Sequence, residues 1–139
     1  MSNTNLIRLC FVIALVATGG SLYFSEVLKY PPCVLCWYQR ICMYPLVAIY
    51  FVALWTEDKN YSKFVFPLLV IGGIIAIYHN LLYYDLIPDS ITPCTQGVSC
   101  TSKQLEWLGF ITIPLLSLVS FLSLTFLELF RVWRFKSYE

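Results

Sequence analysis

Charged residues are so sparse along this chain that they leave four long uncharged runs. The runs hold 17, 16, 21 and 21 residues and cover positions 9–25, 41–56, 64–84 and 107–127. A helix needs about 20 apolar residues to cross the hydrocarbon core of a bilayer, with a range of ~17–25. The second run grows to the 27 residues of positions 30–56 when Arg40 is accepted inside it. The spacing therefore predicts four membrane-spanning helices.

The composition agrees with a membrane protein. The 139 residues suit a single domain, and only 12% of them are charged, against roughly 25% in soluble domains. We predict an all-α, four-helix membrane bundle over residues 1–139. The expected spans are Leu6–Leu28, Cys33–Trp55, Phe64–Tyr84 and Leu108–Leu129. The first span is too long for the apolar core of a signal peptide and lacks a small-residue cleavage pattern, so we expect it to be retained.

Positive charge is distributed unevenly between the two ends of the predicted bundle. One end would hold both termini and six positive residues, and the other end only Lys29 and Lys103. The positive-inside rule therefore predicts cytoplasmic termini and two outer loops, of which the second covers about residues 85–107. A net charge of +1 without a basic run argues against a nucleic-acid partner.

The first outer loop leads into the motif PPCVLCWYQR, which contains Cys33 and Cys36. Proline suits a helix start, and residues three apart share a helix face, so the two sulfur atoms can meet in the first turn. The helix N-terminus favours a thiolate. This arrangement is typical of thiol–disulfide exchange. A structural disulfide or a metal clip remains open, although a zinc site usually needs four ligands.

The second outer loop contains Cys94 and Cys100, separated by five residues that include Gly97. Such a loop closes easily into a disulfide, which would be either a static staple or a redox pair. The segment Gln104–Gly109 is expected to form a short interfacial helix that would rest the cysteine loop on the membrane.

Two polar residues fall inside the apolar spans near these cysteines. Arg40 lies one turn beyond Cys36, where it would either reach the headgroups or face inward and stabilise an anion, such as the Cys36 thiolate or a cofactor oxygen. His79 is expected at a similar depth on the third span, as a satisfied structural histidine or as a proton donor to the same bound group. Cys10 and Cys42 are expected to be small buried residues.

With these motifs in hand, the chain resembles the DsbB family of membrane disulfide-forming proteins, in particular its short-loop branch from Gram-positive bacteria. The resemblance covers nearly the whole chain: four spans, CVLC at the start of the second, an arginine four residues later, and a cysteine pair in the loop before the fourth. In this chain the loop pair is more narrowly spaced than in better-known members, and Gln39 stands where many of them have an acidic residue.

The resemblance implies a multi-pass protein of the bacterial cell membrane that works as an electron relay. A reduced thioredoxin-fold partner outside the cytoplasm would attack the Cys94–Cys100 disulfide at Cys94. The Cys33–Cys36 pair would reoxidise the loop pair and pass two electrons to a membrane quinone, menaquinone or ubiquinone. In that relay Cys36 and Arg40 would lie next to the quinone, and His79 approximately matches the quinone-side histidine of the family.

Beside the electron relay, a second and a third interpretation remain open from the residues alone. A carrier of mercury or another soft metal would also use paired membrane cysteines, with only Cys10 and Cys42 available to lead metal to the inner side. A structural membrane protein with two inert disulfides is the third. Arg40, one turn beyond a CxxC pair, disfavours both.

Overall fold

The structure is a computed structural model, which describes residues 1–94, 97, 99–101, 106–107 and 109–136. Its secondary structure is almost entirely helical, and the only sheet in the described residues is a ladder of two two-residue strands. In chain order the elements are α1 (Asn3–Leu22), a π-helical turn (Tyr23–Val27), α2 (Val34–Thr56), α3 (Ser62–Tyr83), a 3₁₀ turn (Asp89–Ile91), β1 (Glu106–Trp107), β2 (Ile111–Thr112) and α4 (Ile113–Lys136).

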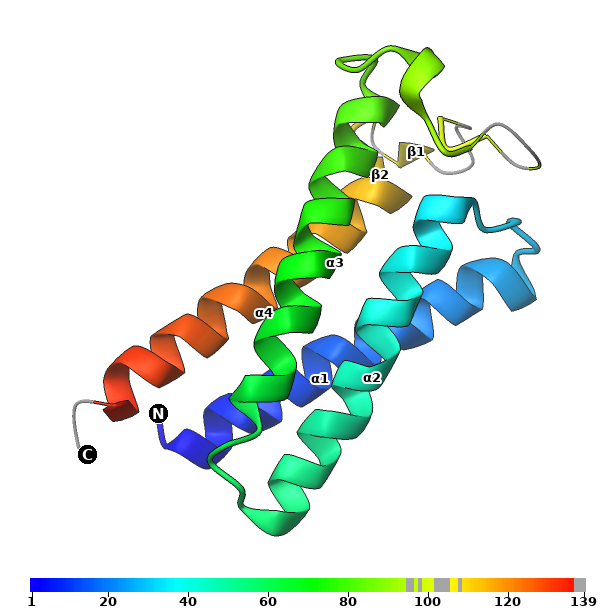
Figure 1. Ribbon diagram of the computed structural model, residues 1–139. Coiled ribbons are helices and arrows are strands. Elements are labelled where there is room, and N and C mark those ends of the chain that lie inside the picture. Colours follow the sequence, from blue (N-terminus) through cyan, green and yellow to red (C-terminus); the bar gives the residue numbers. More distant parts are fainter. Residues whose placement is uncertain (95–96, 98, 102–105, 108, 137–139) are drawn as a thin grey trace.

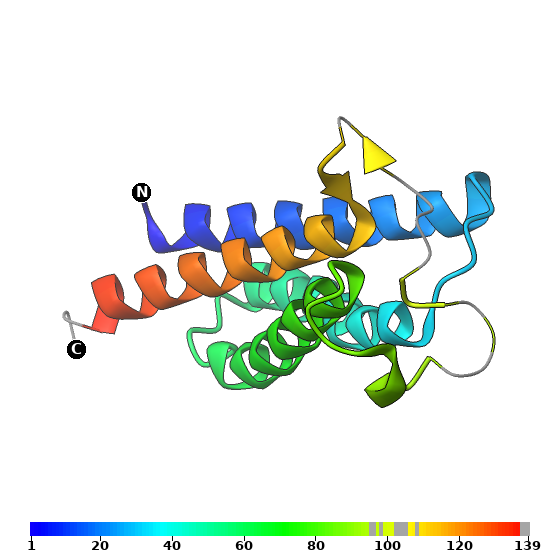
Figure 2. The same ribbon diagram turned by 90° about the horizontal axis from the view of Figure 1, so that it is seen from above.

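The predicted all-α, four-helix fold is confirmed. Within the described residues, α1 with its π-helical turn, α2, α3 and α4 are each long and apolar enough to cross a membrane. Each helix packs against two others, because α1 contacts α2 and α4, and α3 contacts α2 and α4. Figure 1 shows the N-terminus and the end of α4 at one end of this bundle and the segment around β1 and β2 at the other. Figure 2 shows α1 and α4 lying side by side.

Local chemistry sets the helix ends. The Oγ atom of Ser2 accepts a hydrogen bond from the Asn5 N–H at 3.2 Å, so α1 begins at Asn3, earlier than the predicted Leu6. At the C-terminal end of α2, Glu57 takes a left-handed conformation with φ 52°, and the helix stops there.

The short helix predicted over Gln104–Gly109 is wrong at residues 106 and 107. These residues form β1, which pairs antiparallel with β2, while residues 104, 105 and 108 lie outside the described residues. Gly109 has φ +79°, a left-handed conformation that glycine adopts without strain, and the chain reverses there. The reversal also explains why α4 begins at Ile113 instead of the predicted Leu108.

The larger of two buried apolar clusters in the described residues forms the core of the bundle. Tyr50, Phe121 and Leu46 are among its fully buried members, and the ring of Phe121 lies directly over Gly72. A Cβ atom at Gly72 would overlap that ring, so glycine is what lets α3 and α4 approach each other. Cys10 and Cys42 lie in this cluster as buried free thiols, as the sequence predicts.

A buried polar cluster ties three helices together at the end of the bundle that holds the termini. Glu128, which is fully buried, accepts hydrogen bonds from Tyr61 Oη at 2.8 Å and from Ser62 Oγ at 3.4 Å. Arg131 Nε lies 3.2 Å from the same carboxylate, and its guanidinium also donates to Ser62 and to Asn3 Oδ1. Because every carboxylate oxygen has a partner, the ion pair and the hydrogen bonds offset the cost of burying these charges, and the cluster joins α1, α3 and α4.

Candidate redox site at the cysteine end of the bundle

Cys33 is the N-cap residue of α2. Its backbone is extended (φ −77°, ψ 174°), and its Sγ atom accepts a hydrogen bond from the Cys36 N–H at 3.4 Å. The first helical turn then brings the two sulfur atoms to 2.9 Å from each other, with both thiols free. A disulfide has a sulfur–sulfur distance of about 2.05 Å, so oxidation of this pair needs only a small movement.

The environment of Cys33 favours its thiolate. Cys33 precedes the first residue of α2 and is buried, with 5% of its surface exposed. Its pKa is lowered from the ordinary thiol value because the Cys36 thiol donates a hydrogen bond to it, with a further contribution from His79. A thiolate of this kind is both a good nucleophile and a good leaving group.

Cys94 and Cys100 form a disulfide, with Cα atoms 5.9 Å apart. The two sulfur atoms differ in access, since Cys94 is half-buried whereas Cys100 is only 4% exposed. Cys100 packs in one small apolar cluster with Cys33, Leu35 and Leu82, and Cys36 and Cys94 pack against that cluster. The structure therefore brings all four predicted cysteines together at one end of the bundle.

His79 lies between the two cysteine pairs. Its Nε2 atom is 3.1 Å from the backbone oxygen of Cys100 and 3.8 Å from Cys33 Sγ, and its Nδ1 atom is 3.1 Å from Gln39 Nε2. The side chain lines a small crevice together with Cys33, Cys36 and Cys100. A second, larger cavity is lined by Arg40 but not by His79. The two residues were expected at a similar depth along the bundle, but they do not face the same cavity.

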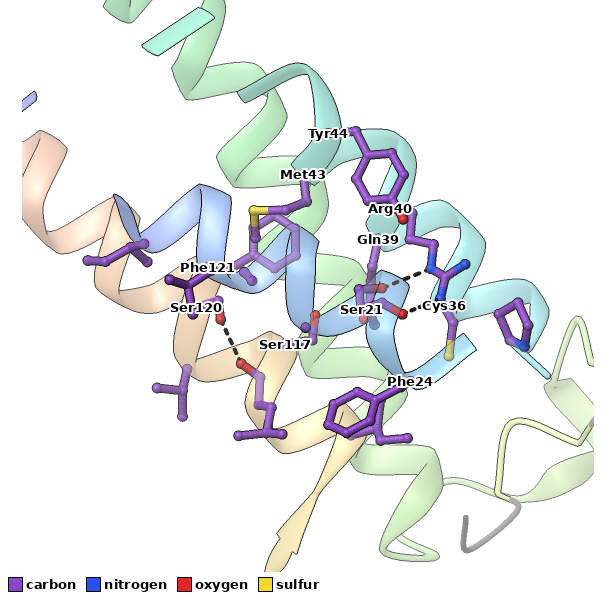
Figure 3. Close-up of a pocket in the computed structure, with 18 of the residues that line it drawn as sticks. Ser21, Phe24, Cys36, Gln39, Arg40, Met43, Tyr44, Ser117, Ser120 and Phe121 are labelled. Atoms are coloured by element: carbon purple, nitrogen blue, oxygen red, sulfur yellow. Dashed lines mark hydrogen bonds between the residues drawn. The ribbon is translucent and has the colours of Figure 1, made fainter. Parts of the chain in front are cut away.

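The larger cavity has a volume of about 510 Å³ and lies between α1, the first half of α2 and the first half of α4. Figure 3 shows Cys36, Gln39 and Arg40 on one side of it and Ser117 and Phe121 on another. Its lining is mostly aliphatic and aromatic, and two of its members on α1 and α4, Val16 and Val119, are 68% and 54% exposed. The cavity therefore opens sideways between α1 and α4, on the lateral surface of the bundle that lipid would cover.

Arg40 lines this cavity one turn below Cys36 and is only 9% exposed. Its Nε atom donates to Ser21 Oγ and its Nη2 atom to the Ser21 backbone oxygen, each at 2.9 Å (Figure 3). The guanidinium also lies 5.1 Å from the centre of the Trp37 ring. The side chain is thus held inward, instead of extending to the headgroups. The π-helical turn of α1 begins two residues after Ser21, and such turns often accompany functional sites.

Three donor atoms here could in principle hold a metal ion. The Sγ atoms of Cys33 and Cys36 and a ring nitrogen of His79 lie within 4.8 Å of one another. Zinc–sulfur bonds of about 2.3 Å in a tetrahedral site imply a sulfur–sulfur separation of about 3.8 Å. The observed 2.9 Å is shorter, and His79 Nε2 is already paired with the Cys100 carbonyl. The geometry suits thiol chemistry better than metal ligation.

Two residues of the site were missed as functional candidates. Gln39 pairs with His79, and Ser21 holds Arg40. The one available signal was that each is a polar residue inside an apolar span, where polar groups usually have a partner.

Comparison with known proteins identifies the family. The family model described as "Disulfide bond formation protein DsbB" matches residues 3–130. The chain is 48% identical over 114 residues to "Disulfide bond formation protein C" of Bacillus subtilis (strain 168), which covers 81% of each chain. It is 45% identical over 122 residues to "Probable disulfide formation protein C 2" of Bacillus anthracis, covering 87% of this chain and 86% of the relative.

The similarity extends beyond that genus. A "Probable disulfide formation protein" of Metapseudomonas resinovorans is 40% identical over 124 residues, covering 88% of this chain and 86% of the relative. No solved structure gave a significant match. With a family model that spans nearly all of the four helices and relatives aligned over most of their length, the chain belongs to the DsbB family of disulfide bond formation proteins.

Proposed function

We propose that this protein is a membrane thiol oxidase that takes two electrons from a thioredoxin-fold protein outside the cytoplasm and transfers them to a membrane quinone. The observation that carries the proposal is one continuous series of contacts. It starts at the half-buried Cys94, passes through its disulfide to Cys100 and on to Cys33, and ends at Cys36 in the wall of the apolar cavity.

The loop pair is the point where electrons enter. Attack by an external thiolate requires an accessible sulfur atom, and of the bonded pair Cys94 is the more exposed. The attack breaks the Cys94–Cys100 bond and releases the Cys100 thiolate, which lies against Cys33. A second thiol of the partner then displaces Cys94, so that the partner leaves as a disulfide and both loop cysteines are reduced.

The Cys33–Cys36 pair is the point where electrons leave. Starting from its disulfide form, attack of Cys100 on Cys33 makes a Cys33–Cys100 bond and releases Cys36 as a thiolate. Attack of Cys94 on Cys100 then restores the loop disulfide and releases Cys33. The two electrons now reside on Cys33 and Cys36, whose sulfur atoms are close enough to bond again once an acceptor removes the electrons.

The cavity fits a quinone head group. A quinone supplies an acceptor of two electrons and two protons, and its flat ring needs an apolar slot with polar groups at its oxygen atoms. Phe24 and Phe121 give the cavity aromatic walls, and Arg40 places a positive charge in it. Tyr44 also lines it, with a buried hydroxyl that has no hydrogen-bond partner among the described residues. A ligand oxygen would satisfy that hydroxyl.

The proposed orientation places both termini in the cytoplasm and both cysteine pairs on the outer side. The termini lie at one end of the bundle and the cysteines at the other (Figure 1). The end of the bundle that holds the termini carries six positive residues, namely Arg8, Lys59, Lys63, Arg131, Arg134 and Lys136. The positive-inside rule supports this orientation, and disulfides persist on the outer side of bacterial membranes.

The proposal is tested by mixing the purified protein with a reduced thioredoxin-fold protein and decylubiquinone and following quinone absorbance. Reduction should require all four cysteines of the two pairs and should persist in Cys10→Ser and Cys42→Ser, because the latter two thiols lie in the core away from the relay.

The three-donor cluster formed by Cys33, Cys36 and His79 supports the soft-metal carrier as the second candidate function. Stoichiometric binding of cadmium by Cys33 and Cys36, with the quinone left oxidised, would favour the carrier.

A further inference from the structure

The His79 ring connects the two cysteine pairs. It is 2% exposed, and its Nε2 atom faces both Cys33 Sγ at 3.8 Å and the backbone oxygen of Cys100 at 3.1 Å. Cys33 belongs to the pair beside the apolar cavity, and Cys100 belongs to the loop pair. A single ring nitrogen therefore contacts both partners of the exchange between the pairs.

The hydrogen bonds fix which ring nitrogen carries the proton. A backbone carbonyl can only accept, so His79 Nε2 must carry a hydrogen in order to pair with Cys100. In the neutral ring Nδ1 is then an acceptor, and the Gln39 amide N–H donates to it at 3.1 Å. Gln39 is itself buried, at 7% exposure. Gln39 thus selects the tautomer that points an N–H at the sulfur of Cys33.

The redox arrangement in the structure matches the product of one particular exchange step of the proposed relay. The loop disulfide is closed, and Cys33 and Cys36 are free thiols. In the step that forms this arrangement, the Cys94 thiolate attacks Cys100 Sγ, the Cys94–Cys100 bond forms, the Cys33–Cys100 bond breaks, and Cys33 departs with the electron pair. The leaving sulfur emerges beside the His79 N–H. A hydrogen bond to a developing thiolate is stronger than one to a neutral group.

We propose that His79 stabilises the Cys33 thiolate as the leaving group of this step and that Gln39 is the positioning residue that fixes the His79 tautomer. The inference rests on the proposed function. It assigns His79 and Gln39 to the thiol–disulfide exchange between the two cysteine pairs. The same N–H holds the Cys100 carbonyl beside Cys33, which keeps the two sulfur atoms in reach until the exchange is complete.

The test follows the exchange without any quinone, so that effects on the cavity do not enter. The full-length protein is oxidised with decylubiquinone, freed of the quinone, mixed with one equivalent of dithiothreitol, quenched with acid and alkylated with a mass tag. Peptide mapping then measures the Cys33–Cys100 disulfide over time. In His79→Leu that species should persist about tenfold longer or more, because a hydrogen bond to a charged group is lost. A lifetime equal to that of the wild type would overturn the inference.

A second set of variants separates tautomer control from folding. His79→Gln keeps an N–H donor without a tautomer choice, so its lifetime should stay within about threefold of the wild type. Gln39→Leu should lengthen the lifetime in the wild-type background and have no effect in the His79→Gln background. If Gln39→Leu lengthened the lifetime equally in both backgrounds, Gln39 would act only through packing and not through the His79 tautomer. Tyr38→Phe, on the exposed face of the same turn, is the matched control and should behave as the wild type.

The outcomes also separate this inference from the proposed function. When the wild-type protein passes electrons from the loop pair to Cys33 and Cys36 but His79→Leu does so equally fast, only the role of His79 is lost. When electrons never leave the loop pair in the wild-type protein, the relay itself is wrong, and the inference fails with it.

Discussion

Arg40 donates two hydrogen bonds to Ser21, one to the side-chain oxygen and one to the backbone oxygen, each at 2.9 Å. This contact fastens the start of α2 to the end of α1 and holds a positive charge in the wall of the apolar cavity, one turn below Cys36. A buried guanidinium that is held by neutral acceptors keeps its charge uncompensated. It is therefore prepared to stabilise negative charge on a ligand in the cavity.

Arg40→Ala should raise the apparent KM for decylubiquinone by about tenfold or more, since a hydrogen bond from a charged group to the ligand is lost. The steady-state assay with a saturating thiol donor measures this. Arg40→Lys should recover only part of the loss, because a lysine cannot reproduce the planar two-point contact with Ser21. An unchanged KM in Arg40→Ala would show that the residue serves only to join the two helices.

Ser21→Ala removes the acceptor of Arg40 Nε and leaves the backbone contact in place. The KM for decylubiquinone should rise by about threefold, the effect of one hydrogen bond of modest strength. Ser123→Ala is the matched control, because Ser123 is half-buried on α4, outside the cavity lining, and its hydroxyl donates to the Val119 carbonyl of its own helix. An equal rise of the KM in both variants would point to a general effect of serine removal and would contradict the positioning of Arg40 by Ser21.

Gly72→Ala should destabilise the bundle by about 1–3 kcal/mol, because the added Cβ atom overlaps the Phe121 ring and overpacks the core. Phe121 also lines the cavity, so a displaced ring should raise the KM for decylubiquinone as well. Gly73→Ala is the control, because a Cβ atom at that position meets nothing within 4 Å. Thermal unfolding in detergent, followed by circular dichroism, should show a loss of stability in the first variant and none in the second.

Glu128→Leu should cost about 3–5 kcal/mol of stability, because it leaves the buried Arg131 guanidinium without its carboxylate. Glu128→Gln should cost less, since it still accepts from Tyr61. The double variant Glu128→Leu/Arg131→Met should recover much of the loss, as no buried charge remains unpaired. The same unfolding measurement checks this order, and a double variant less stable than Glu128→Leu would contradict it.

The four helices could be predicted because charge spacing and hydropathy depend only on the order of residues. The ends of the helices depend on local contacts, such as the Ser2 cap and the reversal at Gly109, which hydropathy does not register. For this reason α4 starts at Ile113 and not at Leu108, and a short strand pair replaces part of the expected interfacial helix.

In the candidate site, too, the depth of a residue could be predicted from the sequence, but the direction of its side chain could not. Depth along a helix follows from residue number, and it placed His79 level with Arg40. The direction in which a side chain points around a helix axis depends on how the bundle packs. In the structure His79 points to Cys33 and Cys100, and Arg40 points into the cavity. The partnership of Gln39 with His79 joins residues 40 positions apart, so no local pattern revealed it.

The central claim is that electrons leave the protein from Cys36 into a quinone bound in the adjacent cavity. The most direct measurement uses Cys94→Ser/Cys100→Ser, a variant without the loop pair, reduced in advance and freed of reductant. Mixed with excess decylubiquinone, it should reduce one equivalent of quinone per protein in a single burst and form the Cys33–Cys36 disulfide. The same variant with Cys36→Ser added should reduce none. A burst that persists without Cys36, or no burst when Cys33 and Cys36 are both present and reduced, would contradict the account.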